Sequence, residues 1–352
     1  MLYDFDDLLI QPAMITSIRS RSQVEPYYME FLEQGVWDRK LPLMTAPMDT
    51  VIDSKNSHYF KDLGITTVFP RIKNPNTDHV SYEDFLSYSL NDFDRIFLDN
   101  TIDIPDGYQV FALIDVANGH MGDLKKSAKT AKTKYGGDLV LMVGNVANPS
   151  TFYDYALIGV DYVRVGIGNG GGCLTTVQTG VGYPLASLIY ECNKYKVNGS
   201  HIKTKIVADG GFKKYSDVIK GLALGADYIM LGSMFNKALE SCGETTSPSH
   251  GTVDQYSDKT KEMFDVDIPL YKVFRGMSTK EVQLTLGKGD LKTSEGVVRQ
   301  HKVEYTLQGW VDNFTSYLKS AMSYTDKKEL PHFIGGVTTN IISPNSFNRF
   351  DK

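Results

Sequence analysis

A cysteine that follows a glycine-rich loop is the residue in this sequence best placed to do chemistry. Tyr162–Val165 is a short β-branched and aromatic run, which predicts a buried strand. It leads into Gly166-Ile167-Gly168-Asn169-Gly170-Gly171-Gly172-Cys173, where the glycines predict positive φ angles or a close approach to a ligand. Backbone N–H groups in such a loop stabilise anions and can lower the pKa of a thiol. Cys173 is therefore a candidate nucleophile, and the alternative is a packed, inert cysteine beside a tight turn.

Two known glycine-loop motifs do not describe this segment. Gly166, Gly168 and Gly171 match G-x-G-x-x-G, but the acidic residue expected at the end of a second strand is missing. The Walker pattern needs Gly-Lys-Ser/Thr after the glycines, and Cys173-Leu174 stands there instead.

Composition excludes several classes of protein. The 352 residues are 41% hydrophobic and 22% charged, with a net charge of −5, so there is no basic footprint for nucleic acid or an anionic membrane. The 3 cysteines are too widely spaced for a disulfide framework or a zinc pattern, and the 7 histidines are scattered. The acidic start, MLYDFDDLLI, is unlike a signal peptide, and no run of about 20 apolar residues could span a bilayer. We expect a cytoplasmic protein without a transition metal.

The elements that must position Cys173 follow a regular rhythm. Apolar, β-rich runs recur at Leu41–Ala46, Ile65–Pro70, Arg95–Leu98, Val110–Asp115, Leu139–Val143, Tyr162–Val165, Ile206–Asp209 and Tyr228–Gly232. Helix-like stretches lie between most of them, at Met121–Tyr135, Ser150–Ile158, Pro184–Tyr195 and Lys214–Leu224. Continuous apolar strands that alternate with helices predict a parallel sheet covered on both faces. Eight such units favour a closed (β/α)8 TIM barrel, an α/β fold, over an open sheet.

The ends of the expected strands carry polar or glycine-rich tips. In a barrel these tips meet at the C-terminal face, where barrel enzymes keep their active sites. Each tip alone would more often be a turn, but together they predict a site. They are Met48-Asp49-Thr50, Arg71, Asp115-Val116-Ala117-Asn118-Gly119, Gly144-Asn145, the Cys173 loop, Asp209-Gly210-Gly211 and Gly232-Ser233.

The alternation of predicted strands and helices stops after Ala238. Glu240–Asp267 is polar and rich in Ser, Thr and Gly, which is typical of a long excursion or flap. Trp310–Tyr324 predicts a last outer helix, and Gly335–Lys352 predicts an irregular tail. We expect one barrel domain over residues 1–352, with a flap and active-site loops within residues 240–305.

Several stretches together are specific enough to indicate a family. From about Tyr3 to about Phe333 the chain resembles the IMP dehydrogenase/GMP reductase family, and more closely its GMP reductase branch. No space for the paired regulatory (CBS) domains of many dehydrogenases separates the second and third strands, and the Arg-Tyr pair with which dehydrogenases activate water is missing. The stretches that carry the resemblance are Tyr3–Leu9, Pro47–Val51, Asp115–Gly119, Gly144–Val146, Cys173–Thr175, Thr179–Pro184, Asp209–Gly211, Gly232–Met234, Gly276–Ser278 and Ser294–Gly296.

The resemblance implies a covalent reductive deamination. Cys173 would attack C2 of GMP and form a thioimidate, which splits one difficult substitution into two easier steps. Thr175, with Glu295 from the flap, would transfer protons as ammonia leaves. NADPH would deliver hydride to C2 and release IMP.

The resemblance also implies binding roles. Substrate residues would be Asp209 for the ribose, Gly210, Gly211, Gly232 and Ser233 for the phosphate, and Phe274, Arg275, Gly276, Ser294 and Gly296 around the base. Cofactor residues would be Arg71, Asp115, Val116 and Ala117, together with Ser20, Arg21, Ser320, Ala321, Met322 and Ser323, which would reach a neighbouring subunit's cofactor in a homotetramer. A K⁺ ion would take oxygen ligands at Gly168, Gly170, Cys173 and Thr176.

The chain departs from the family pattern at three places. Gly171 stands where the family has a serine that touches phosphate, which removes a contact worth about 1 kcal/mol. Arg71 replaces the usual reductase lysine, and Glu240–Asp267 and Gly296–Tyr305 are longer than expected. A deoxy or modified purine nucleotide therefore stays open as the substrate. So do three other functions: an IMP dehydrogenase without regulatory domains, a non-catalytic nucleotide-binding barrel and a flavin-dependent barrel oxidoreductase.

Overall fold

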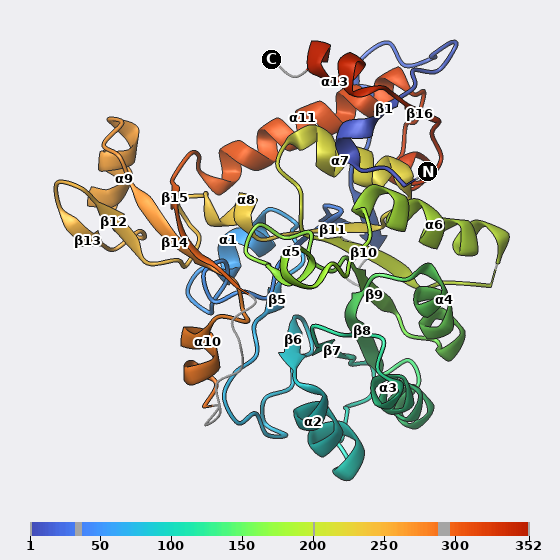
Figure 1. Cartoon of the computed structure of the whole chain (residues 1–352), viewed down its shortest axis with the longest axis vertical. Coiled ribbons are helices and arrows are strands. Elements are labelled where there is room, and N and C mark those ends of the chain that lie inside the picture. The colour runs from blue at the N-terminus through green and yellow to red at the C-terminus, as the bar shows by residue number, and fades with distance from the viewer. Residues whose placement is uncertain (1, 32–36, 200, 288–295, 351–352) are drawn as a thin grey trace.

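An eight-stranded parallel barrel forms the centre of the molecule (Figure 1). A computed structural model describes residues 2–31, 37–199, 201–287 and 296–350. The strand order is β4-β11-β10-β9-β8-β7-β6-β5, and a parallel bridge between Met44 and Thr66 joins the two outermost strands. This confirms the (β/α)8 prediction. The strands are β4 (Leu43–Thr45), β5 (Val68–Phe69), β6 (Phe85–Tyr88), β7 (Val110–Asp115), β8 (Leu139–Val146), β9 (Tyr162–Val165), β10 (Lys205–Asp209) and β11 (Tyr228–Leu231).

The barrel strands are apolar on both faces because both faces are buried. In β8, Val140 and Met142 belong to the cluster that fills the barrel interior. Their neighbours Leu139, Leu141 and Val143 belong to the cluster that packs beneath the helices. Side chains alternate between the two faces of a strand, so a strand buried on both sides reads as one continuous apolar run.

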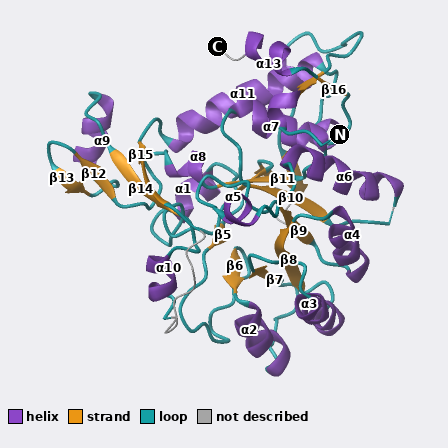
Figure 2. Ribbon diagram, in the orientation of Figure 1, coloured by secondary structure: helices purple, strands orange, loops and turns teal. Residues whose placement is uncertain are grey.

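Helices follow most of the strands and cover the outside of the barrel (Figure 2). Buried Leu124, Ala128 and Ala131 recur at helical spacing in α3, while the lysines of that helix lie mostly on its outer face. No helix within the described ranges is long and apolar enough to span a membrane. The helices associated with the barrel are α1 (Ser57–Asp62), α2 (Leu90–Phe93), α3 (Gly122–Tyr135), α4 (Pro149–Ile158), α5 (Thr175–Thr179), α6 (Leu185–Asn198), α7 (Tyr215–Leu224), α8 (Ser233–Asn236) and α11 (Leu307–Tyr324).

One of the eight expected strands is wrong. Arg95–Leu98 lies in a π-helical segment, Asp94–Asp99, that continues α2, and β6 takes the expected strand's place in the sheet. The rings of Phe93 and Phe97 stack with centroids 4.5 Å apart, and both side chains are buried. Their spacing of four residues is the helical signal that a run as short as Arg95–Leu98 obscured.

The polar excursion after β11 builds a second, antiparallel sheet. Its strand order is β13-β12-β14-β15, and α9 packs on it through a small core that includes Met263, Leu270 and Val303. In Figure 1 this unit projects from the side of the barrel. Its elements are β12 (Thr245–Ser247), β13 (Gly251–Val253), α9 (Asp258–Asp265), β14 (Tyr271–Arg275), α10 (Lys280–Thr285) and β15 (Val298–Lys302).

The C-terminal tail is ordered, contrary to the expectation of an irregular segment. Strand β16 pairs antiparallel with β1, with Leu8 opposite Ile341. Because Leu8 is fully buried, the first strand needs a partner for its backbone, and the tail provides it. The remaining elements are β1 (Leu8–Ile10), β2 (Tyr28–Phe31), β3 (Trp37–Lys40), α12 (Leu330–Phe333), β16 (Thr339–Ile341) and α13 (Pro344–Phe350), with 3₁₀ turns at Phe5–Asp7 and Arg21–Gln23.

Asp227 connects β10 and α6 at the N-terminal end of the barrel, opposite the C-terminal strand tips. Its carboxylate accepts the N–H of Ile206 at 2.7 Å and pairs with Lys196, and these two charged side chains are only 7% and 17% exposed. We expect Asp227→Asn to lower the free energy of unfolding by about 3 kcal/mol, because it leaves a largely buried lysine without its counter-charge. Urea unfolding measures the loss. Asp154→Asn, which breaks a half-exposed pair with Lys125, is the matched control and should cost less than about 1 kcal/mol.

Candidate active site

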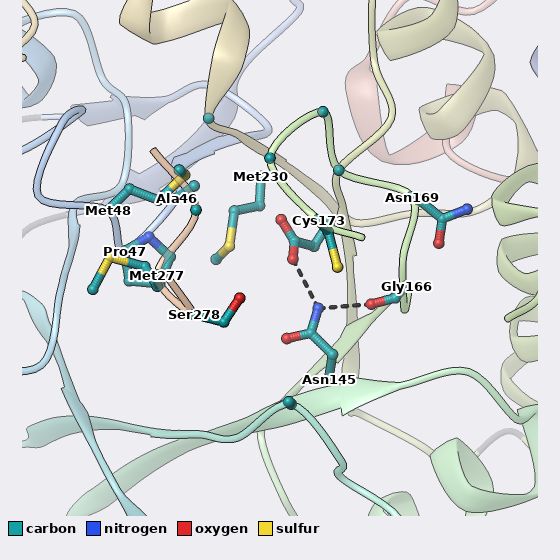
Figure 3. A pocket seen from close by; sticks show the side chains of 18 of the residues that line it. Ala46, Pro47, Met48, Asn145, Gly166, Asn169, Cys173, Met230, Met277 and Ser278 are labelled. Atoms are coloured by element: carbon teal, nitrogen blue, oxygen red, sulfur yellow. Dashed lines mark hydrogen bonds between the residues drawn. The ribbon is translucent and has the colours of Figure 1, made fainter. Parts of the chain in front are cut away.

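A cavity of about 540 Å³ opens at the C-terminal ends of the barrel strands. Its lining includes residues from most of the strand tips that the sequence singled out, so the predicted convergence of these tips is confirmed. Val116 and Ala117 line it after β7, and Gly276 and Ser278 line it after β14. In Figure 3 methionines 48, 230 and 277 lie on one side of the cavity, and Cys173 and Asn145 face them.

Cys173 lies at the cavity wall, half-buried, just before α5. Its thiol donates to Thr175 Oγ1 at 3.3 Å, and its backbone N–H donates to the Gly170 carbonyl at 3.0 Å. The hydroxyl of Thr175 is thus within direct reach of the sulfur. This is the geometry that a nucleophile and a proton-transfer partner need.

The segment after β14 and the start of β15 close over the cysteine loop. Gly296 forms an antiparallel bridge with Cys173, and Val297 N–H donates to the Gly172 carbonyl at 3.1 Å. Gly276 N–H in turn donates to the Val297 carbonyl at 3.1 Å. Two predicted site residues, Ser294 and Glu295, lie outside the described residues, and the chain resumes at Gly296, whose backbone is bridged to that of Cys173.

A line of alternating charges crosses the cavity floor. Arg164, on β9, donates to Asp115 Oδ1 at 2.7 Å and to Asp209 Oδ2 at 3.0 Å. Arg71 Nε lies 3.3 Å from the other oxygen of Asp115. Burial alone would lower the pKa of Arg164, but the two carboxylates outweigh it and raise the pKa, so the guanidinium stays charged. Arg164 thereby joins a predicted cofactor residue to the predicted ribose residue.

Asn145 holds Asp209 from a second direction (Figure 3). Its Nδ2 donates to Asp209 Oδ2 at 2.7 Å and to the Gly166 carbonyl at 2.8 Å. Both protein contacts of the Asp209 carboxylate use Oδ2, and among the described residues none bonds to Oδ1. Asp209 is therefore fixed in orientation with one oxygen left for a ligand hydroxyl, which fits its expected role.

Arg164 was not among the predicted site residues, although the sequence carries a signal for it. Its neighbours Val163 and Val165 pack under the helices, so Arg164 must face the barrel interior. A charged side chain on the inner face of a barrel strand needs buried partners, which is the signal that could have identified it. Asn145 was seen only as part of a polar tip.

Glycines shape the expected phosphate end of the cavity. Gly210 and Gly211 have φ angles of 84° and 82°, which disfavour other residues. A Cβ on Gly210 would also lie 2.9 Å from the Cα of Gly170, so the tip of β10 and the cysteine loop are in close contact. Gly232 and Ser233 follow β11 and line the same cavity.

Two other sets of predicted residues lie away from the cavity. Arg275 forms a two-point ion pair with Asp49, at 2.6 and 3.2 Å, and does not contribute to the described lining of the cavity. The segments around Arg21 and Ser323 lie side by side, since Arg21 donates to Ser316 Oγ at 3.2 Å and Thr16 donates to the Ser323 carbonyl at 2.9 Å. Neither segment lines the cavity as described. The expected group is Ser20, Arg21, Ser320, Ala321, Met322 and Ser323.

The loop beside Cys173 is rich in oxygen donors. The hydroxyl of Thr176 donates to the Val181 carbonyl at 2.7 Å and lies 3.1 Å from the Ile167 carbonyl. A Cβ on Gly168 would collide with the Thr176 hydroxyl at 1.7 Å, so this glycine is required by the close packing. Carbonyl and hydroxyl oxygens suit a hard cation such as K⁺ in kind.

His120 joins the loops after β7 and β8. Its Nε2 accepts the Ala147 N–H at 3.1 Å, and its Nδ1 lies 3.0 Å from Thr151 Oγ1. Burial lowers the pKa of His120, and protonation at Nε2 would break the bond to Ala147. We expect the contribution of His120 to the free energy of unfolding to be full above the pKa of an unfolded histidine, about 6.5. This contribution should decrease as the pH falls toward the lower pKa that His120 has in the folded protein. Urea unfolding at pH 5 to 8 measures this, and His120→Gln should flatten the pH dependence.

Comparison with known proteins identifies the family. A family model for the IMP dehydrogenase / GMP reductase domain matches residues 106–348. The chain belongs to this family.

Curated relatives cover nearly the whole chain. A GMP reductase of Oceanobacillus iheyensis is 28% identical over 342 residues, which is 94% of this chain and 92% of that protein. A GMP reductase of Aliivibrio salmonicida is 31% identical over 258 residues, covering 68% and 70%. GMP reductase 1 of Mus musculus is 26% identical over 347 residues, covering 93% and 91%. The chain is thus an oxidoreductase of the IMP dehydrogenase/GMP reductase family.

Proposed function

We propose that the protein catalyses the NADPH-dependent reductive deamination of GMP to IMP and ammonia. The observation that carries the proposal is the thiol of Cys173, bonded to Thr175 in a cavity that also holds Asp209, while the Cys173 backbone forms a β-bridge with Gly296. Relatives across most of the chain's length are named GMP reductase, which supports the substrate.

The chemistry begins with addition of the Cys173 sulfur to C2 of GMP. Thr175 takes the thiol proton and, with Glu295, passes protons to the departing amine, so that the C2–N bond breaks and a thioimidate forms. Hydride from a bound nicotinamide cofactor would reduce C2, and Cys173 would then leave as the thiolate when the C–S bond breaks. IMP and ammonia are the products, and the cysteine is regenerated.

Substrate binding follows from the arrangement of the strand tips. Asp209 Oδ1 accepts a ribose hydroxyl, while Arg164 and Asn145 hold the carboxylate in place. The tips of β10 and β11, Gly210-Gly211 and Gly232-Ser233, receive the 5′-phosphate at the usual phosphate site of a barrel. Phe274 and Gly276, with Ser294 and Gly296, enclose the base.

NADPH supplies the hydride when it is bound, and the residues around Asp115 fit a polar cofactor. Arg71 Nε is buried and faces Asp115 Oδ2 at 3.3 Å without a well-aligned hydrogen bond in the described part of the chain, so a ligand oxygen there would satisfy it better. Val116 and Ala117 form the adjoining wall. In a homotetramer the Arg21 and Ser320–Ser323 segments would meet a neighbouring subunit's cofactor. K⁺ would be held by carbonyls of Gly168, Gly170 and Cys173, with Thr176 beside them.

Nicotinamide absorbance in two parallel reactions tests the proposal. One contains protein, K⁺, GMP and NADPH, and the other contains protein, K⁺, IMP and NAD. We expect NADPH to disappear only in the first, with one ammonia released for each NADPH consumed. NADH formation from IMP would contradict the proposal and indicate a dehydrogenase. Loss of NADPH with dGMP but not GMP would shift the substrate to a deoxynucleotide.

A further inference from the structure

One wall of the cavity carries a phenyl ring that stacks on His301, a residue with no expected role in the site. Phe274 on β14 lines the cavity and is 3% exposed. Its ring stacks on that of His301 on β15, with centroids 4.6 Å apart and planes 23° apart. His301 pairs with Lys272 across the two strands, so Phe274 is its diagonal neighbour on the same face of the sheet.

Asn236 fixes the orientation of the imidazole. The Asn236 amide nitrogen donates to the carbonyls of Thr50 at 2.8 Å and Val273 at 3.0 Å, so the amide oxygen faces His301. That oxygen lies 2.8 Å from His301 Nδ1, and since a carbonyl oxygen only accepts, Nδ1 must carry the proton and donate. Asn236 is fully buried at the end of α8, so the imidazole is anchored to the barrel itself.

The Phe274 ring reaches two parts of the site. A Cβ added to Gly172 would lie 3.1 Å from Phe274 Cε1, and one added to Gly232 would lie 3.9 Å from Cε2. The ring therefore fills the space between the loop that carries Cys173 and the tip of β11 that leads to Ser233. Any movement of the ring would change the separation of these two segments.

We propose that His301 and Asn236 are positioning residues that hold Phe274 between Gly172 and Gly232 and thereby set the place of the Cys173 loop. The expected effect on GMP turnover rests on the proposed function, whereas the expected effect on the position of the Cys173 thiol does not. Neither residue touches the reacting atoms, and both act through the phenyl ring. The antiparallel unit formed after β11 thus contributes to the active site through β14 and β15.

Alkylation of Cys173 by iodoacetamide, followed by peptide mass spectrometry, measures the position of the loop without any substrate. We expect His301→Ala to speed alkylation about five- to tenfold, because an aromatic pair contributes about 0.5–1.5 kcal/mol. His301→Phe keeps the stack but loses the bond to Asn236, so its rate should fall between those of the wild type and His301→Ala. Gln300→Ala, on the opposite face of β15, is the matched control and should not change the rate.

Steady-state kinetics with GMP and NADPH provide the second measurement. His301→Ala and Asn236→Ala should raise KM for GMP about tenfold and lower kcat less, with partial recovery in His301→Phe. An unchanged alkylation rate in folded His301→Ala protein would overturn the proposal. If His301→Ala does not fold, equal alkylation rates in His301→Phe and His301→Gln would overturn it as well. A wild-type protein that does not consume NADPH with GMP would refute the proposed function, while the alkylation experiment would still decide the role of His301.

Discussion

Replacing Cys173 by alanine should abolish GMP-dependent NADPH oxidation, with a loss on the order of 10⁴-fold or more. The thiol is the only described group at the site that can add covalently to C2 and later leave, and Thr175 lies 3.3 Å from it to move the proton. Because the side chain is half-buried at a cavity wall, its truncation should not unfold the barrel. Stopped assays for ammonia and IMP measure the loss of activity, and far-UV circular dichroism shows whether the variant keeps its fold.

Cys192→Ala is the control for this experiment. Cys192 is fully buried in α6, and its burial raises the pKa of the thiol, so it has no role in the site. We expect Cys192→Ala to lose some stability but to retain turnover. Mass spectrometry should also find GMP-derived mass on Cys173 in wild-type protein that is quenched before NADPH is added. Turnover by Cys173→Ala within tenfold of wild type would refute the covalent route and favour direct hydride addition.

Arg164→Met should have the largest effect on stability and a comparable effect on activity. The substitution leaves the largely buried carboxylate of Asp209 without a cation, and Asp115 keeps only its ion pair with Arg71. Removing one partner of a buried ionic group costs about 3–5 kcal/mol, mainly because the remaining charges are uncompensated. Asp209 would also lose the bond that aims Oδ1 at the ligand. We expect a lower urea midpoint at pH 7 and a KM for GMP raised at least about tenfold.

A charge-conserving variant at the same position distinguishes this mechanism from a simple packing defect. Arg164→Lys keeps the charge but cannot form the fork to two carboxylates, and it should give an intermediate loss. A stability loss in Arg164→Lys as large as that in Arg164→Met would contradict the electrostatic account.

The barrel and its cysteine could be predicted because their signals are local. Leu139–Val143 and Tyr228–Gly232 are continuous apolar runs, since strands of a parallel barrel are buried on both faces. The glycines before Cys173 indicate close packing before any partner is known, and the contacts at Gly168 and Gly172 bear this out. The wrong prediction of a strand at Arg95–Leu98 also comes from relying on a local pattern, because a four-residue apolar run fits a strand or a helix equally well.

The sequence does not reveal which segments that are distant along the chain contact each other in the fold. Arg164 meets its two carboxylates only when β7, β8, β9 and β10 are assembled in the same sheet, and β16 pairs with β1 across nearly the whole length of the chain. The contact of His301 with Phe274 and Asn236 likewise requires β14, β15 and α8 to be assembled. Local patterns of apolar residues and glycine specify elements and their buried faces, because those depend on neighbours in sequence. The partners of a buried charge or ring depend on the packing of all elements at once, and so only the tertiary structure decides them.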